Sequence, residues 1–436
     1  MKPKNSLFDK YRGPIKNLSV LWVFTLVGAV FSFITQVVLS RGLDITQYGY
    51  FSAAYSMVVL FTPLALFGMA PYWLKLFGKN GWGAVKLVPS SLKFVTFTSI
   101  ITLTLFLLWA YLGPHSPEFS SLLKVMSIIL FSQVLIELLS TKYQLEESYF
   151  SLAVWQFLLG ALKLVFVSAT IYISVQAIPS QVIGTGYAVI TFMLSVYAFF
   201  KIRGISNGGI ALAGHVRANK DKNTILKPNY FKETWPFALS GVFYFIYFQS
   251  DIILLSYLDS PESSAIYNVA FIIISSALLF PKILYQKFLL PKIHRWSHHD
   301  KLKFYKVYAI GNKYMFILGV VSMCLLLLLS NELVSFIFGD TYKGAVSILM
   351  ILSVTIVFRF TAASVGSVLV TQNNMTIKVI LMGIVAVVNI VLNIIFIPRY
   401  GPTGAAIATV ISDGLLLCLY FYAVNKYVFN NDFHQK

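Results

Sequence analysis

The stretch that decides the fold is IKVILMGIVAVVNIVLNIIFI at residues 377–397, followed after PRYGPT by GAAIATVISDGLLLCLYFYAVN at residues 404–425. Each half is about the length of the roughly 20 apolar residues that a membrane-spanning helix needs. Glycine and proline in the short connection are typical of a turn. The stretch therefore predicts two spanning helices that cross a bilayer in opposite directions.

The whole chain has the composition of a membrane protein. Its 436 residues are 58% hydrophobic and 11% charged, with a mean hydropathy of +0.76. A soluble domain carries roughly 25% charged residues, so this chain lacks the polar surface to enclose itself in water. Soluble enzymes, secreted disulfide scaffolds and disordered proteins are excluded.

Twelve apolar stretches of spanning length follow one another along the chain. The longest polar interruption, at residues 201–233, is basic and rich in glycine, and we interpret it as a cytoplasmic linker. We expect an all-α integral membrane protein with about twelve transmembrane helices, arranged as two six-helix lobes (1–200 and 234–436) around a central cavity. The predicted spans are 17–40, 50–74, 92–113, 119–141, 149–174, 182–200, 234–257, 264–286, 307–330, 345–371, 377–397 and 404–425.

Positive charge predicts the orientation. The net charge is +18, and 28 of the 34 Lys and Arg residues fall on one side if the N-terminus is cytoplasmic. Cytoplasmic loops of membrane proteins carry an excess of Lys and Arg. Both termini are therefore predicted to be cytoplasmic, and anionic membrane lipids account for the charge without a nucleic-acid partner.

Sequence motifs of cofactor and metal chemistry are absent. No GxxxxGK[ST], GxSxG, HExxH or CxxC occurs, and no cofactor or metal is predicted. His294, His298 and His299 have a spacing that suits a metal. They lie in a basic amphipathic segment, however, which favours a place at the membrane interface.

Four basic residues are candidates for binding an anionic substrate. Lys163 and Arg359 lie near the middle of one span in each half, where an ionisable side chain indicates function or a buried acidic partner. Arg41 and Lys282 lie near span ends and could add charge, mark the interface or extend toward it. A cavity lined by such residues would suit a diphosphate.

Three embedded acids, Glu137, Asp251 and Asp413, are candidates for coupling to a proton or sodium ion, or for holding the basic residues in place. Tyr244 and Tyr247 share a helix face with Asp251 and could stack on sugar rings. Most aromatic side chains are expected to face lipid or the membrane interface instead.

Five sequence motifs occur in order along almost the whole chain. They are Leu39-Ser40-Arg41-Gly42-Leu43 with Gln47-Tyr48-Gly49-Tyr50-Phe51, Asp251-Ile252-Ile253-Leu254 with Tyr267-x-x-Ala270, Phe338-Gly339-Asp340-x-Tyr342-x-x-Ala345, Asn389-x-x-Leu392-Asn393, and Ile397-Pro398-x-Tyr400-Gly401-Pro402-x-Gly404-Ala405-Ala406-x-Ala408-Thr409. Arg41 and Asp251 are the charged candidates inside them. In these motifs the chain resembles bacterial polysaccharide (O-antigen, Wzx-like) flippases of the multidrug/oligosaccharidyl-lipid/polysaccharide exporter superfamily.

The resemblance implies a flippase that moves undecaprenyl-diphosphate-linked oligosaccharides from the cytoplasmic to the outer leaflet of the bacterial inner membrane by alternating access. Such a protein makes or breaks no bond and is not an enzyme. Its partners would be the lipid-linked substrate, membrane lipids, a coupling ion, and polymerase or other assembly proteins. The alternatives are an ion-coupled small-molecule exporter of the same superfamily and a membrane-embedded polysaccharide polymerase.

Overall fold

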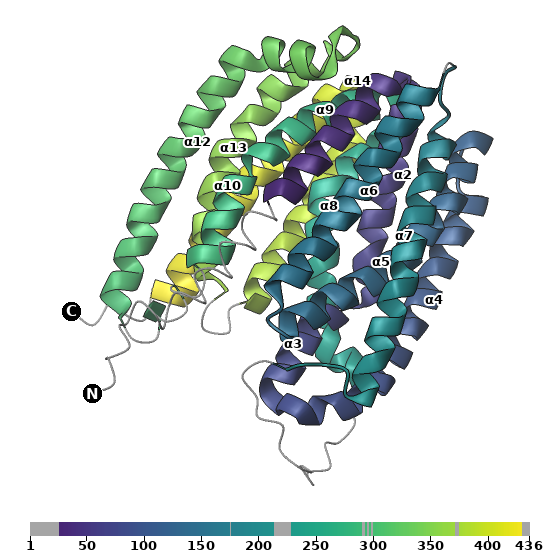
Figure 1. Cartoon of the computed structure of the whole chain (residues 1–436). Coiled ribbons are helices and arrows are strands. Elements are labelled where there is room, and N and C mark those ends of the chain that lie inside the picture. The colour runs from purple at the N-terminus through teal and green to yellow at the C-terminus, as the bar shows by residue number, and fades with distance from the viewer. Residues whose placement is uncertain are drawn as a thin grey trace, which may run out of the picture. The chain divides into compact units, whose positions relative to one another are not determined.

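The structure is a computed structural model that describes residues 26–174, 176–212, 228–289, 293, 296–297, 300–370 and 375–429, without the side chains of residues 286–288. The described residues form helices and turns and contain no strand, which confirms the all-α prediction (Figure 1). The histidine cluster and most of the predicted linker, residues 213–227, lie outside the described part.

The chain divides into two compact units. The first comprises Met1–Leu39 and Val58–Leu239, and the second comprises Ser40–Met57 and Ser240–Lys436. Helices α2 and α8 therefore each contribute residues to both units. The predicted lobe boundaries at residues 200 and 234 stay a prediction.

In the first unit, helix α5 (Pro117–Leu145) is the central element. It packs against four other helices of the unit. These are α3 (Met69–Asn80), α4 (Val88–Leu112), α6 (Tyr149–Ile173) and α7 (Ser180–Arg203), with the 3₁₀ turns η1 (Gly81–Leu87) and η2 (Gly204–Asn207) at their ends.

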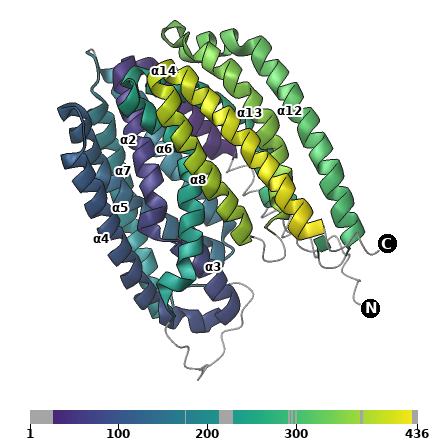
Figure 2. The ribbon, with the colours of Figure 1, turned by 180° about the vertical axis from the view of Figure 1, so that it is seen from behind.

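In the second unit, helix α13 (Ala345–Val368) is the central element and packs between α12 (Lys301–Phe338) and α14 (Met375–Val424) (Figure 2). Most residues of α13 are buried. The elements that contribute the rest of the second unit are α2 (Ile45–Leu66) and α8 (Tyr230–Leu258), which both units share, and α9 (Pro261–Ala277), α10 (Leu279–Lys282), η3 (Ile283–Leu289), η4 (Asp340–Tyr342) and η5 (Asn425–Phe429).

Helices α5 and α9 begin with the same three residues, Ser-Pro-Glu. The hydroxyl of Ser116 accepts a hydrogen bond from the backbone N–H of Phe119 (3.2 Å), and Ser260 accepts one from Ser263 (3.1 Å). A serine cap, a proline in the first turn and an acid beside it all favour a helix start. Local sequence therefore fixes where these two helices begin.

Helix α14 consists of two legs that meet at Gly401 (Figure 2). Gly401 has a φ of 53°, a conformation that favours glycine. A Cβ on Gly404 would lie 2.4 Å from the carbonyl oxygen of Phe396, so the two legs approach too closely for a side chain there. The predicted turn between residues 397 and 404 is confirmed.

The predicted number of spans is not confirmed. Eight helical segments in the described part are long and apolar enough to cross a membrane, or nine if the pair Pro261–Ala277 and Leu279–Tyr285, bent by 42°, is one span. Two of the eight, Ile45–Leu112 and Met375–Phe429, each contain two predicted spans. The helix over Leu26–Gly42 is shorter, and residues 1–25 lie outside the described part.

The start of α2 is held in the second unit. Nδ2 of Asn268 in α9 donates to the hydroxyls of Tyr48 and Ser52, both at 3.0 Å. The hydroxyl of Thr46 donates to Glu262 at 2.5 Å. A Cβ on Gly49 would lie 1.8 Å from the carbonyl oxygen of Pro261, so the absence of a side chain at Gly49 lets α2 approach the first residue of α9.

We expect Gly49→Ala to destabilise the protein, because the added methyl group would force α2 away from α9. Overpacking of this kind costs about 1–3 kcal/mol. Thermal unfolding of the purified protein in detergent should show a lower melting temperature. Gly78→Ala is the matched control, since no atom lies within 4 Å of its Cβ position, and it should be neutral or slightly stabilising. Equal melting temperatures for the two variants would contradict the packing argument.

Candidate functional site

Asp251 of α8 is the centre of a buried polar network in the second unit. It is 1% exposed, and three side chains donate hydrogen bonds to its carboxylate. These donors come from α9 and from both legs of α14: Tyr267 (2.6 Å), Asn393 (2.6 Å) and Thr409 (2.7 Å). Three donors on one buried carboxylate compensate much of the cost of removing it from water.

Arg359 of α13 forms a buried ion pair with Asp413 of α14. Nε donates to Oδ2 at 2.7 Å, and the two residues are 8% and 1% exposed. The guanidinium carbon also lies 4.6 Å from the ring centre of Phe248 and 5.3 Å from that of Tyr247. Cations stack favourably on aromatic faces, so one acid and two rings contact this arginine in the membrane-crossing part of the unit.

The pair and the Asp251 network are neighbours. Phe248 and Tyr247 precede Asp251 by three and four residues on α8, and Thr409 precedes Asp413 by four residues on α14. Residues at these spacings lie on one helix face. The cluster thus holds two carboxylates and one guanidinium.

Several buried polar atoms of the cluster have no hydrogen-bond partner among the described residues. They are Arg359 Nη1, Asn389 Nδ2, Asn393 Oδ1 and Asp413 Oδ1. Buried polar groups are usually satisfied, and each exception needs an explanation. Two of these atoms are oxygens, the ligand type that sodium and other hard cations prefer. The donor set therefore fits a small cation or a proton, with Asp251 and Asp413 as the charged groups.

The other candidates of the second unit lie outside the cluster or at its edge. Arg41 donates to the carbonyl oxygens of Ile337 (2.8 Å) and Phe336 at the last turn of α12. A cation is favourable at that end of a helix. Tyr244 stacks on Phe248, with ring centres 4.6 Å apart. Lys282 is exposed at the end of α10.

Lys163 and Glu137 belong to the first unit. The ammonium of Lys163 in α6 lies 4.7 Å from the ring centre of Tyr187 in α7. Glu137, on the central helix α5, accepts a hydrogen bond from Gln133 at 3.3 Å. The roles of all these residues in substrate or ion binding stay predictions.

No role was predicted for Tyr267, Asn389 or Asn393, although all three lie in the sequence motifs given above. Neutral polar residues in apolar spans are common, so composition does not distinguish them. The available signal was the spacing of four between Asn389 and Asn393, which places both amides on one helix face.

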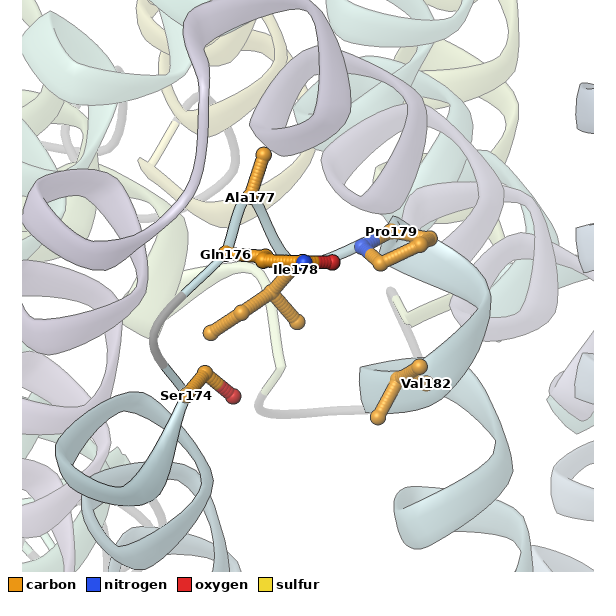
Figure 3. A pocket seen from close by; sticks show the side chains of 6 residues that line it. All are labelled: Ser174, Gln176, Ala177, Ile178, Pro179 and Val182. Carbon is orange, nitrogen blue, oxygen red and sulfur yellow. The ribbon is translucent and has the colours of Figure 1, made fainter.

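A surface hollow of about 360 Å³ lies in the first unit, at the connection between α6 and α7 (Figure 3). Ser174 and Gln176 are the polar side chains that line it, beside Ala177, Ile178, Pro179 and Val182. None of the described residues that line it is ionisable or belongs to the predicted site residues, so they add no chemistry to the candidate site.

Helices long and apolar enough to cross a membrane, with an ionic cluster buried among them, define a multi-pass membrane protein. Its fold is that of known transporters. A structure of the lipid II flippase MurJ in an inward closed conformation matches with a TM-score of 0.70 and 16% identity, over 93% of this chain and 87% of that one. An inward-facing MATE family multidrug resistance transporter matches with a TM-score of 0.64 and 15% identity, over 93% and 96% of the two chains.

Sequence comparison gives the family. A family model described as polysaccharide biosynthesis protein matches residues 15–297, and the chain belongs to this family. The capsular polysaccharide biosynthesis protein CapF of Staphylococcus aureus is 27% identical over 159 residues, which are 36% of this chain and 39% of CapF. The match thus spans about two fifths of that relative.

We expect removal of either partner of the Arg359–Asp413 pair to be strongly destabilising, because a charge would remain in the apolar interior. Breaking a buried pair costs about 3–5 kcal/mol, whereas replacing both partners with apolar residues is often neutral. Arg359→Leu and Asp413→Leu should each reduce the yield of folded protein and its melting temperature. The double variant should recover most of both. A double variant as unstable as the sum of the single variants would show that the two side chains are not each other's partner.

Proposed function

We propose that this protein is a flippase that moves lipid-linked oligosaccharides between the leaflets of a membrane. Membership of the polysaccharide biosynthesis family supports the substrate class, and a fold shared with a lipid II flippase over 93% of the chain supports the activity. The observation that carries the mechanism is the buried cluster of Asp251, Arg359 and Asp413, because ionisable residues inside spans indicate transport.

We further infer that Asp251 takes up the coupling ion, a proton or sodium. Its carboxylate is reached by side chains from three helical segments, α9 and the two legs of α14, so neutralising it would alter contacts to all three at once. An ion can drive a conformational change only if it interacts differently with the two states. Substrate binding by Lys163, Arg359, Arg41, Lys282, Tyr244 and Tyr247 in a central cavity, and contacts to polymerase or other assembly proteins, remain part of this proposal.

A vesicle assay tests both parts. Purified protein would be reconstituted with an undecaprenyl-diphosphate-linked oligosaccharide, whose exposure on the opposite leaflet is followed with a membrane-impermeant lectin. We expect flipping that responds to an imposed sodium or proton gradient. Asp251→Asn should reduce the rate at least tenfold, because an amide has no negative charge for a proton or sodium ion to neutralise.

Asp340→Asn is the matched control, since Asp340 is an exposed acid paired with Lys343 at 3.3 Å, and such surface pairs contribute little. Flipping at the normal rate by Asp251→Asn, or with both gradients collapsed, would remove the coupling role. Absence of flipping together with export of cationic dyes would instead favour the multidrug exporter, whose fold matches nearly as well. Elongation of the oligosaccharide would favour the polymerase.

We also propose the bacterial inner membrane as the location, with both termini cytoplasmic. The support is the distribution of positive charge, with 28 of the 34 Lys and Arg residues on one side. A reporter enzyme that works only in the cytoplasm should be active when it is fused after residue 215 or at the C-terminus. Activity of a periplasmic reporter at either position would overturn the orientation.

A further inference from the structure

Lys378 is a basic residue of the second unit and is not among the predicted site residues. It lies in the first turn of α14, and its side chain is half-buried. Its ammonium is 6.0 Å from the ring centre of Tyr420, on the second leg of α14, and 3.6 Å from the position of a Cβ on Gly366 in α13. The lysine therefore points between α13 and α14 and not out along the surface.

The charge of Lys378 has neither an ion-pair nor a hydrogen-bond partner among the described residues. None of their acidic side chains forms an ion pair with it, and it makes no hydrogen bond to them. The other basic candidates of the unit differ in this respect, since Arg359 pairs with Asp413 and Arg41 donates to carbonyl oxygens of α12. A basic side chain turned into a membrane-spanning unit is costly unless it is compensated.

The surroundings of Lys378 suit an anion. Tyr420 is buried, its hydroxyl makes no hydrogen bond to the described residues, and its ring centre lies 6.0 Å from the ammonium of Lys378. Gly366 leaves this space open, because a Cβ there would lie 2.9 Å from the Tyr420 ring. The first turn of a helix also favours negative charge, and Lys378 is within that turn of α14.

We propose that Lys378 and Tyr420, opposite Gly366, form a binding site for the phosphate group of a lipid at the end of the second unit where α13 ends and α14 begins. This inference rests on the proposed function, in which the substrate carries a diphosphate. The site would bind the headgroup by charge and by two donors, while the lipid chain stays in the hydrocarbon.

Binding can be measured separately from flipping. The full chain in lipid nanodiscs would be titrated with undecaprenyl diphosphate, with phosphatidylglycerol and with inorganic diphosphate, and bound molecules counted by native mass spectrometry. We expect Lys378→Ala to weaken binding of the lipid diphosphate at least tenfold. Lys378→Arg should retain most of the binding because it keeps the charge, and Gly366→Ala should weaken binding because it fills the space.

Lys426→Ala is the matched control. Lys426 is also on a helical segment at the end of α14 and contacts a tyrosine, with its ammonium 3.1 Å from the Tyr422 hydroxyl, but it is exposed. Its removal should leave binding unchanged. Among the three ligands, the one whose binding depends most on Lys378 identifies the source of the phosphate.

The melting temperature separates a ligand role from a structural one. Removing an uncompensated charge should leave the melting temperature of Lys378→Ala unchanged or raise it. A lower melting temperature with normal lipid binding would show that Lys378 is structural and would overturn the site. If the wild-type protein binds the lipid through Lys378 but does not flip it, the proposed function fails and the site stands. If Lys378→Ala both binds and flips normally, the site fails and the function stands.

Discussion

A charged side chain among membrane-crossing helices has to find its partners within the protein, and the second unit is organised around this constraint. Asp251, Arg359 and Asp413 come from three different helices, and each contacts a group of opposite charge or a hydrogen-bond donor on another helix. Leaving any of them alone would cost several kcal/mol. The apolar faces alone would allow many rotations of these helices, whereas the ion pair and the hydrogen bonds to Asp251 favour the rotation that brings these side chains together.

The fold was predictable where it depends on composition. Long apolar runs separated by turn residues predicted helices, and Gly401 between Pro398 and Pro402 predicted the turn of α14. The number of separate spans stays a prediction, because breaks between helices depend on backbone geometry that hydropathy does not register. Phe67 and Gly68 both have positive φ where α2 gives way to α3, inside one continuous apolar segment.

The site was predictable in its charged members and not in its neutral ones. Asp251, Arg359 and Asp413 were recognisable because ionisable residues are rare in spans. Tyr267, Asn389 and Asn393 were not, because neutral polar residues are common in apolar spans. Lys378 was not predicted for another reason. It lies near the end of a predicted span, where lysine is common, and only the structure shows that its side chain points toward Gly366 of α13.

The cluster and Lys378 carry charges of opposite sign, so the lysine could be regarded as a distant counterion of the excess carboxylate. The spacing along α14 argues against this. Lys378 precedes Asn393, which donates to Asp251, by 15 residues, and this corresponds to about 22 Å at 1.5 Å per residue. Even a long side chain does not close that distance, and the ring centre of Tyr420 lies 6.0 Å from the ammonium. No acidic side chain of the described residues forms an ion pair with Lys378, so its charge is not compensated by the carboxylates of the cluster.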